Sequence, residues 1–218
     1  MNIVSFYAPR PTHPLFVDYT PYLNLLRASC EKFGHRHIVI TDDPSFHDGF
    51  CLKLPLSLMR AILAGQLAYL RSDHAKEDTI FVGADCVLAN DPKDISSLEC
   101  EIAGTTDDFI DCILNTGMIF VRGGTKKAED LWWEALCHCG DVWGDDQKSL
   151  AKVFSATLEH GVYPRHGLKM AFLPMEPWNV APDHPWDNRS SAKILHFRGS
   201  RKKWMVGYCA DYLNLKAA

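Results

Sequence analysis

The chain has 218 residues, 47% of them hydrophobic and 23% charged, which is enough apolar material to bury a substantial core. We therefore expect one α/β domain over residues 1–218. The formal net charge of −4 argues against a surface built throughout for nucleic acid, and the lack of a leader-like N-terminus or a run of roughly 18 apolar residues predicts a cytoplasmic protein with no membrane span.

The first third of the chain alternates between strand and helix patterns. Short apolar runs typical of buried strands lie at residues 3–8, 37–41 and 78–82. Apolar residues recur at helical spacing over 20–33 and 56–70. Thr20 is expected to cap the first helix, with Pro21 in its first turn and Gly34 after its end. This βαβαβ order predicts a mostly parallel sheet whose ligands bind beyond the carboxyl ends of the strands.

The remainder of the chain predicts a mixed arrangement. Strands are expected over 102–105, 109–114, 116–121, 168–174 and 193–197. Helices are expected over 126–137, which is rich in tryptophan, and over 145–154. The fold class is therefore α/β, with a mixed sheet flanked by helices.

Tyr7, Asp42 and Asp85 lie at the carboxyl ends of predicted strands. A carboxylate placed where an apolar strand leaves the sheet is partly desolvated, so Asp85 favours a cation or hydrogen-bond donors beside it. Mg²⁺ and Mn²⁺ use such oxygen ligands and share them with substrate phosphates. The alternative is that Asp85 only caps a turn.

A basic run, His196-Phe197-Arg198-Gly199-Ser200-Arg201-Lys202, follows the last predicted strand. The glycine allows the backbone to approach a phosphate, the lysine neutralises it, and the histidine is able to ligate a cation. Their three-residue spacing after a strand predicts a diphosphate site.

Two polar segments of the second half are candidates for the same cleft. Asn115-Thr116-Gly117 lies between two predicted strands and either faces a cleft or forms an ordinary bend. Asp145-Asp146-Gln147 opens a predicted helix, where one of the two aspartates is expected to act as a cap. Asp146 and Gln147 join the site if this end of the helix faces the same cleft.

Charge is unevenly distributed along the chain. Residues 73–108 contain ten acidic and two basic residues, whereas 188–204 contain six basic residues and no acidic one. The two segments are able to meet around a metal and a phosphate, and the alternative is that both are solvated faces.

The eight cysteines are scattered mainly through apolar segments, as expected of reduced core thiols. Only Cys137-His138-Cys139 resembles a metal cluster. It lacks a second pair of ligands at zinc-site spacing, so core packing is the preferred interpretation.

In chain order, these segments resemble the retaining glycosyltransferases of family 8 and related GT-A nucleotide-diphospho-sugar transferases, over nearly the whole chain. Four motifs carry the resemblance: Gly83-Ala84-Asp85 for the Asp-x-Asp metal motif, Leu114-Asn115-Thr116-Gly117 for a Phe-Asn-x-Gly strand, Asp146-Gln147 for an Asp-Gln pair, and His196, Gly199 and Lys202 for His-x-x-Gly-x-x-Lys. After these, Lys203-Trp204 departs from the usual Lys-Pro-Trp order.

The resemblance implies a GT-A fold, with a nucleotide-binding half over residues 1–100 and a half for the acceptor and donor sugar over 101–218, which ends in the diphosphate-binding turn. It implies transfer of a sugar, with retention, from a nucleotide diphosphate donor, expected to be UDP-linked, to a hydroxyl of a glycan or small molecule. The residues implied for the nucleotide and diphosphate are Phe6, Tyr7, Thr41, Asp42, Arg60, Ala84, Gly199 and Lys202. Those implied for a Mn²⁺ or Mg²⁺ ion are Asp85 and His196, and those implied for catalysis at the donor sugar are Asp146, Gln147 and Asn115.

One position departs from the family pattern, because Gly83 stands where the first aspartate of the metal motif is expected. Loss of a carboxylate weakens a divalent site, which leaves two other interpretations open. In one, the enzyme works without metal and Lys202, Arg198 and Arg201 carry the charge of the diphosphate. In the other, the chain binds sugar nucleotides without transferring the sugar.

A different acceptor is a further alternative. The basic tail, with Trp204 and Tyr208, suits a modified base in DNA because stacking aromatic rings beside positive charge favour a nucleic-acid strand.

Overall fold

The computed structural model describes residues 1–9, 17–44, 46, 49–53, 56–108 and 112–216. Its main sheet has eight strands in the order β3-β2-β1-β4-β7-β6-β9-β8. In that order the strands span Gly49–Cys51, Arg36–Thr41, Asn2–Phe6, Thr79–Val82, Leu114–Val121, Ile102–Thr106, Leu168–Leu173 and Gly161–Arg165. A second sheet pairs β10 (Ile194–His196) with β5 (Cys86–Leu88). The predicted α/β class with a mixed sheet is confirmed.

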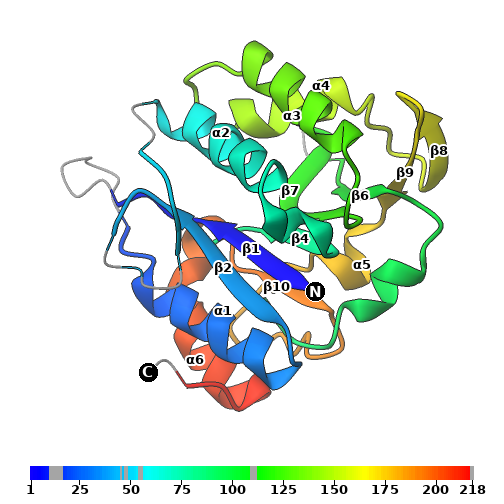
Figure 1. Ribbon diagram of the computed structural model, residues 1–218. Helices are drawn as coiled ribbons and strands as arrows, with labels where there is room; N and C mark the ends of the chain where they lie inside the picture. Colours follow the sequence, from blue (N-terminus) through cyan, green and yellow to red (C-terminus); the bar gives the residue numbers. More distant parts are fainter. Residues whose placement is uncertain (10–16, 45, 47–48, 54–55, 109–111, 217–218) are drawn as a thin grey trace.

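Helices cover both faces of the main sheet (Figure 1). The α-helices are α1 (Thr20–Lys32), α2 (Leu58–Leu70), α3 (Lys127–His138), α4 (Asp145–Val153), α5 (Met175–Trp178) and α6 (Lys202–Leu213), and the short 3₁₀ helices are η1 (Asp73–Lys76), η2 (Lys93–Ser97) and η3 (Gly199–Arg201). Helices α2, α3 and α4 pack together on one face, whereas α1, α6 and the β10–β5 pair lie on the other (Figure 1).

Alternate residues of each central strand face the two helix layers, because side chains of a strand point to opposite faces in turn. Val4 and Phe81 pack in the core cluster that contains α2, α3 and α4. Their neighbours Ile3, Ile80 and Val82 pack in the cluster on the side of α1. Since both faces are covered, these strands carry buried apolar residues on both sides, which is why their sequences contain short apolar runs instead of a strict alternation.

The ends of the central strands that carry the candidate site residues lie together at one end of the sheet, where β1, β2 and β4 finish. β1 pairs in parallel with β2 and with β4, as the βαβαβ order predicts. β7 runs antiparallel to β4, so its first residues lie where β4 ends. β6 pairs Gly104 with Ile119 but Thr105 with Asn115, so three residues of β7 have no partner on β6. β7 therefore leaves the regular ladder where it reaches this edge.

Several predicted boundaries were wrong. Of the strand expected over 109–114, residues 109–111 lie outside the described part of the chain, 112 and 113 are not in a strand, and strand structure begins at Leu114. Asn115 and Thr116 are thus the start of one strand, β7, rather than a bend between two. Thr20 does not cap α1 through its side chain; instead Asp18 Oδ1 accepts a hydrogen bond of 2.9 Å from the Thr20 amide.

Several elements were missed in the sequence, among them β3, β5, β8 and α6. β3 has only three residues and lies at the edge of the sheet, and β8 is largely exposed, so neither has a strong apolar pattern. Helix α6 begins at Lys202, inside the run that was interpreted as a basic turn.

None of the helices in the described part of the chain is long and apolar enough to cross a membrane. All eight cysteines are free thiols, as expected, but Cys51 is exposed and Cys112 only partly buried, so the expectation of a core thiol was wrong for Cys51. Cys139 is buried, as a core thiol should be, but Cys137 and His138 are exposed, so core packing was the wrong interpretation for these two.

Candidate active site

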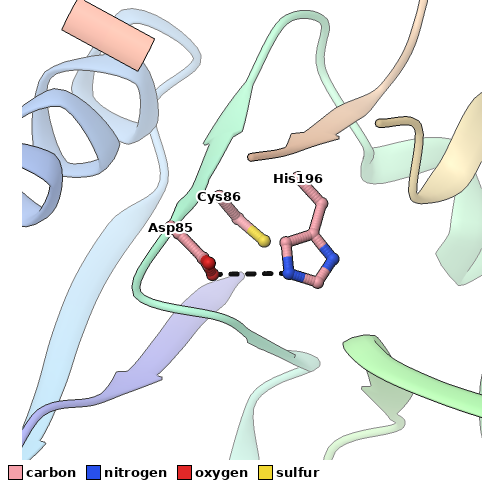
Figure 2. Close-up of side chains that lie close together, drawn as sticks. All are labelled: Asp85, Cys86 and His196. Atoms are coloured by element: carbon pink, nitrogen blue, oxygen red, sulfur yellow. Dashed lines mark ion pairs between the residues drawn. The ribbon is translucent and has the colours of Figure 1, made fainter. Parts of the chain in front are cut away.

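The centre of the candidate site is formed where β4 ends and the chain turns into β5. Gly83-Ala84-Asp85 connects the two strands, and β10 lies antiparallel to β5 with His196 opposite Cys86. The amide of Phe197 donates a 2.9 Å hydrogen bond to the Asp85 carbonyl. This strand pairing carries His196 to the side chain of Asp85, as Figure 2 shows.

Asp85 makes an ion pair with Lys202 and, when His196 is protonated, a second one with His196. Its Oδ2 lies 2.7 Å from Lys202 Nζ and its Oδ1 lies 3.3 Å from His196 Nε2. Burial raises the pKa of Asp85, but the charges and hydrogen bonds of protonated His196 and of Lys202 outweigh burial and hold the pKa well below its ordinary value. Burial lowers the pKa of Lys202, and the carboxylate of Asp85 more than reverses this, so the pKa of Lys202 is raised. Asp85 is therefore a carboxylate and Lys202 an ammonium group.

A chain of hydrogen bonds orients His196 from its other side. The hydroxyl of Thr105 donates to the Asn115 carbonyl at 3.2 Å and accepts from Asn179 Nδ2 at 2.8 Å. The remaining amide oxygen, Asn179 Oδ1, lies 3.1 Å from His196 Nδ1. Because that oxygen only accepts, Nδ1 carries the proton, and in neutral His196 the lone pair of Nε2 faces the Asp85 carboxylate. Two acceptors that face each other favour a cation between them.

The donor atoms of this cluster fit a hard divalent cation. One ligand atom each from Asp85, Cys86 and His196 lies within 4.8 Å of the others. Burial raises the pKa of Cys86 well above its ordinary value, and its Sγ donates to the Gly117 carbonyl at 3.5 Å, so Cys86 stays a thiol. A carboxylate oxygen and an imidazole nitrogen remain, a set that suits Mn²⁺ or Mg²⁺ when phosphate oxygens and water complete it. The histidine is oriented through its second nitrogen, as is usual for metal ligands.

Two glycines leave room for this arrangement. A Cβ at position 117 would overlap Nδ1 of His196 and lie 2.9 Å from Asn179 Oδ1. A Cβ at position 83 would lie 2.7 Å from Asp85 Oδ1. Gly83 therefore does more than remove a carboxylate from the expected motif, since it also lets the Asp85 side chain fold back toward His196.

The start of β7 contacts the start of α4. Gln147 Oε1 accepts hydrogen bonds from the amide of Thr116 at 3.1 Å and from its hydroxyl at 3.2 Å. Asn115 Oδ1 accepts from the Gly117 amide at 3.0 Å, so this oxygen supports the irregular backbone of β7. The predicted segments around Asn115 and Gln147 are thus brought together.

Asp145 and Asp146 differ in environment. Asp145 Oδ2 accepts a 2.9 Å hydrogen bond from the Val142 amide in the preceding loop. The N-cap of α4 is Gly144 and no side chain caps the helix, so the predicted cap was wrong. Asp146 is buried, and burial raises its pKa to about 6. A buried carboxyl with a raised pKa in the first turn of α4 is typical of a functional position.

The residues expected to hold the nucleoside lie around the ends of β1 and β2. Tyr7 is buried against Tyr19, Phe46 and Ala84, and its hydroxyl donates to Asp18 Oδ1 at 3.4 Å. Thr41 is fully buried and its Oγ1 accepts from the Asp43 amide at 3.0 Å.

The other members of this set lie nearby or on α2. Asp42 follows Thr41 and is half-buried, and Phe6 packs in the core on the side of α2. Arg60 lies in the first turn of α2, where its buried Nε has no hydrogen-bond partner among the described residues. Gly199 opens η3 with φ of +65°, a conformation that favours glycine, just before Lys202.

Sequence reasoning missed several residues of the cluster. The Lys202 ammonium lies 5.8 Å from the ring centroid of Tyr19, and Asn179 and Thr105 orient His196. None of these three occurs at a spacing that marks a site, and each is brought in from another part of the fold.

The acidic middle and the basic tail do meet. Three basic residues of the tail form ion pairs with the acidic segment: Lys193 with Asp94 at 3.0 Å, Arg198 with Asp107 at 3.0 Å, and Lys202 with Asp85 at 2.7 Å. These segments are therefore not simply solvated faces.

Beside the cluster is a hollow of about 240 Å³ whose wall includes Asn179, the partner of His196. Its charged lining residues are Asp107, Glu176, Asp183, Arg189, Arg198 and Arg201. Arg198 pairs with Asp107, and Arg201 Nη2 lies 3.3 Å from Asp183 Oδ1. Three arginines and three acids leave the lining close to neutral.

Comparison with solved structures decides the fold family. A glycosyltransferase involved in glycosylation of the major capsid of PBCV-1 superposes with a TM-score of 0.62 at 14% identity, over 95% of this chain and 97% of that one. The galactosyltransferase LgtC, in complex with donor and acceptor sugar analogues, superposes with a TM-score of 0.61 at 12% identity, over 100% and 97%. This chain has the GT-A fold of these glycosyltransferases.

The glycosyltransferase GlyE of Streptococcus pneumoniae TIGR4 also matches, with a TM-score of 0.60 at 12% identity, over 98% of this chain and 62% of that one. No family model matches the sequence, and no curated protein matches it either. The GT-A fold expected from the motifs is thus confirmed through structure.

Proposed function

We propose that the protein transfers a sugar from a nucleoside diphosphate donor, expected to be UDP-linked, to an acceptor hydroxyl, with retention at the anomeric carbon. The observation that carries this proposal is the cluster of Asp85, His196 and Lys202 at the carboxyl edge of β4 in a GT-A fold. In open α/β sheets this edge is where ligands bind.

Sugar transfer requires stabilisation of the departing diphosphate, because negative charge builds on the diphosphate as the glycosidic bond breaks. Lys202 supplies a fixed ammonium group at the amino end of α6, and Gly199 allows the backbone of η3 to approach phosphate oxygens. Asp85 and His196 would hold a Mn²⁺ or Mg²⁺ ion. Such an ion supplies charge neutralisation to the leaving diphosphate when bound.

The donor sugar is proposed to lie over the start of β7. Gln147 is held there by Thr116, and Asp146 and Asn115 lie beside it in the chain segments that meet at this point. The nucleoside would occupy the ends of β1 and β2, near Phe6, Tyr7, Thr41, Asp42, Arg60 and Ala84.

The acceptor is proposed to enter the hollow lined by the Arg198–Asp107 and Arg201–Asp183 pairs. Paired arginines and carboxylates present donors and acceptors together without net charge, which suits the hydroxyls of a glycan or small polyol.

The test is product analysis with a panel of nucleotide sugars, with Mn²⁺, with Mg²⁺ and with a chelator. Lys202→Ala should reduce transfer by about a hundredfold or more, the effect of removing one such electrostatic contact, while the exposed Lys203→Ala should not. Near-normal turnover of the Lys202 variant would count decisively against the proposal.

Because Gly83 replaces the first aspartate of the metal motif, a second candidate function is the binding of sugar nucleotides without transfer of the sugar. Its signature is donor affinity by calorimetry with neither transfer nor donor hydrolysis.

A DNA acceptor is less favoured. Tyr208 is 2% exposed and its hydroxyl donates to the Asp187 carbonyl at 2.9 Å, and several basic residues of the tail are already ion-paired. A steep loss of activity with salt on DNA substrates, absent with free sugars, would restore it.

A further inference from the structure

Lys202 already neutralises the Asp85 carboxylate that would hold a metal ion. Its ammonium nitrogen lies 2.7 Å from Oδ2 of Asp85, and the two side chains are only 17% and 11% exposed. The pair is a close contact shielded from water, where charges interact more strongly than at a surface. Lys202 is held there from two sides, by the start of α6 and by the Tyr19 ring 5.8 Å from the ammonium.

The second oxygen of the same carboxylate faces His196. Oδ1 of Asp85 lies 3.3 Å from Nε2 of His196, whose other nitrogen is engaged by Asn179. A cation held by Asp85 and His196 would therefore share this carboxylate with the lysine ammonium. Repulsion between the two cations opposes that state unless one of them acquires another anionic partner.

Counting charge shows what that partner is. Asp85 and Lys202 sum to zero, so a divalent ion bound alone leaves an excess of +2, and the diphosphate of a nucleotide sugar bound alone leaves about −2. With both bound the charges would cancel, because Asp85 and His196 would hold the metal and Lys202 would pair with the diphosphate. Each ligand thus removes the electrostatic obstacle to the other.

We propose that Lys202 competes with the divalent cation for Asp85, so that metal and nucleotide bind cooperatively and the empty site holds metal poorly. This inference rests on the proposed donor class but concerns binding, not transfer. By linkage the effect is reciprocal: the factor by which nucleotide tightens metal binding equals the factor by which metal tightens nucleotide binding.

The test titrates Mn²⁺ into the full chain, with and without saturating UDP, and follows free Mn²⁺ by electron paramagnetic resonance. For the wild type, UDP should tighten Mn²⁺ binding about tenfold or more, within the usual range of such coupling. For Lys202→Met, Mn²⁺ alone should bind several-fold more tightly than to the wild type, and the effect of UDP should shrink. Loss of structure would weaken Mn²⁺ binding, so tighter Mn²⁺ binding by Lys202→Met cannot result from misfolding.

Two variants serve as controls. Lys203→Met removes the same charge from the adjacent, exposed position and should behave like the wild type. Lys202→Arg keeps a cation on Asp85, so in the absence of UDP it should bind Mn²⁺ as weakly as the wild type does. This variant also provides a test if the methionine variant does not fold.

Three results would overturn the inference. The first is equal Mn²⁺ affinity with and without UDP, and the second is no Mn²⁺ binding under either condition. The third is tight binding of Mn²⁺ alone to both the wild type and Lys202→Arg. The proposed function fails separately. If no nucleotide sugar is turned over, the proposed transfer is wrong, but cooperative binding of Mn²⁺ and UDP is still supported by the titrations. If transfer persists in a chelator, the proposed transfer is supported but the metal is not needed for it.

Discussion

The Cα of Gly117 packs directly against the imidazole of His196, with no space for a side chain between them. A Cβ there would overlap His196 Nδ1 and lie 2.9 Å from Asn179 Oδ1. The glycine of the Asn-x-Gly segment therefore sets the position of a histidine that comes from the far end of the chain, in β10.

Gly117→Ala should push His196 away from Asp85. We expect a loss of stability of about 1–3 kcal/mol, typical of overpacking, and weaker UDP-dependent Mn²⁺ binding, measured by chemical denaturation and titration. Gly207→Ala is the matched control, since a Cβ there meets nothing within 4 Å and lies in helix α6. It should be neutral or stabilising by up to about 1 kcal/mol. Wild-type Mn²⁺ binding by the Gly117 variant would show that His196 does not depend on this contact.

Thr105→Val should impair the site without touching it. The substitution removes the hydroxyl that holds Asn179 Nδ2 at 2.8 Å, so the orientation of His196 is no longer secured. Loss of such support commonly lowers metal affinity by about 10–100-fold, which a Mn²⁺ titration in the presence of UDP would measure. Thr105→Ser restores the hydroxyl and should recover most of the affinity. Equal affinities of the two variants would assign the effect to packing instead.

Asp146 should make stability depend on pH. Its folded pKa, about 6, lies above the ordinary value of 3.8, so between these values the folded state binds more protons than the unfolded state. Its contribution to the free energy of unfolding therefore falls as pH rises from about 4 to 6, by roughly 2 kcal/mol. Asp146→Asn should remove this slope in urea unfolding measured from pH 4 to 8.

The control for that experiment is Asp145→Asn, which removes a neighbouring carboxylate that is engaged by the Val142 amide. It should leave the slope in place. A wild-type pH profile for the Asp146 variant would contradict the burial argument.

Arg198→Met should act on the acceptor and not on the donor. Breaking its 3.0 Å contact with Asp107 alters the wall of the proposed acceptor hollow, so the KM for the acceptor should rise at least several-fold. UDP affinity by calorimetry should change little. Arg71→Met serves as the control, because it also breaks an ion pair, with Glu129 at 3.6 Å, but at the C-cap of α2. A loss of UDP affinity in the Arg198 variant would instead place this arginine at the diphosphate.

The sequence alone was sufficient for the βαβαβ start and the fold class, and it predicted that a strand-end aspartate belongs to the same site as a distant histidine and lysine. These depend on local information: apolar periodicity, turn residues, and the spacing of His196, Gly199 and Lys202. Short or exposed elements such as β3 and β8 were missed because their few residues carry no such pattern.

Only the tertiary structure decided how these residues act on one another. That Lys202 lies on Asp85, that Asn179 and Thr105 orient His196, and that Gly117 must lack a side chain all follow from the pairing of β10 with β5 and the packing of α6. Such contacts join segments far apart in the chain, and local spacing does not encode them because they depend on how the strands and helices pack together. Gly83, which in the sequence is a missing carboxylate, becomes in the fold the space into which the Asp85 side chain turns.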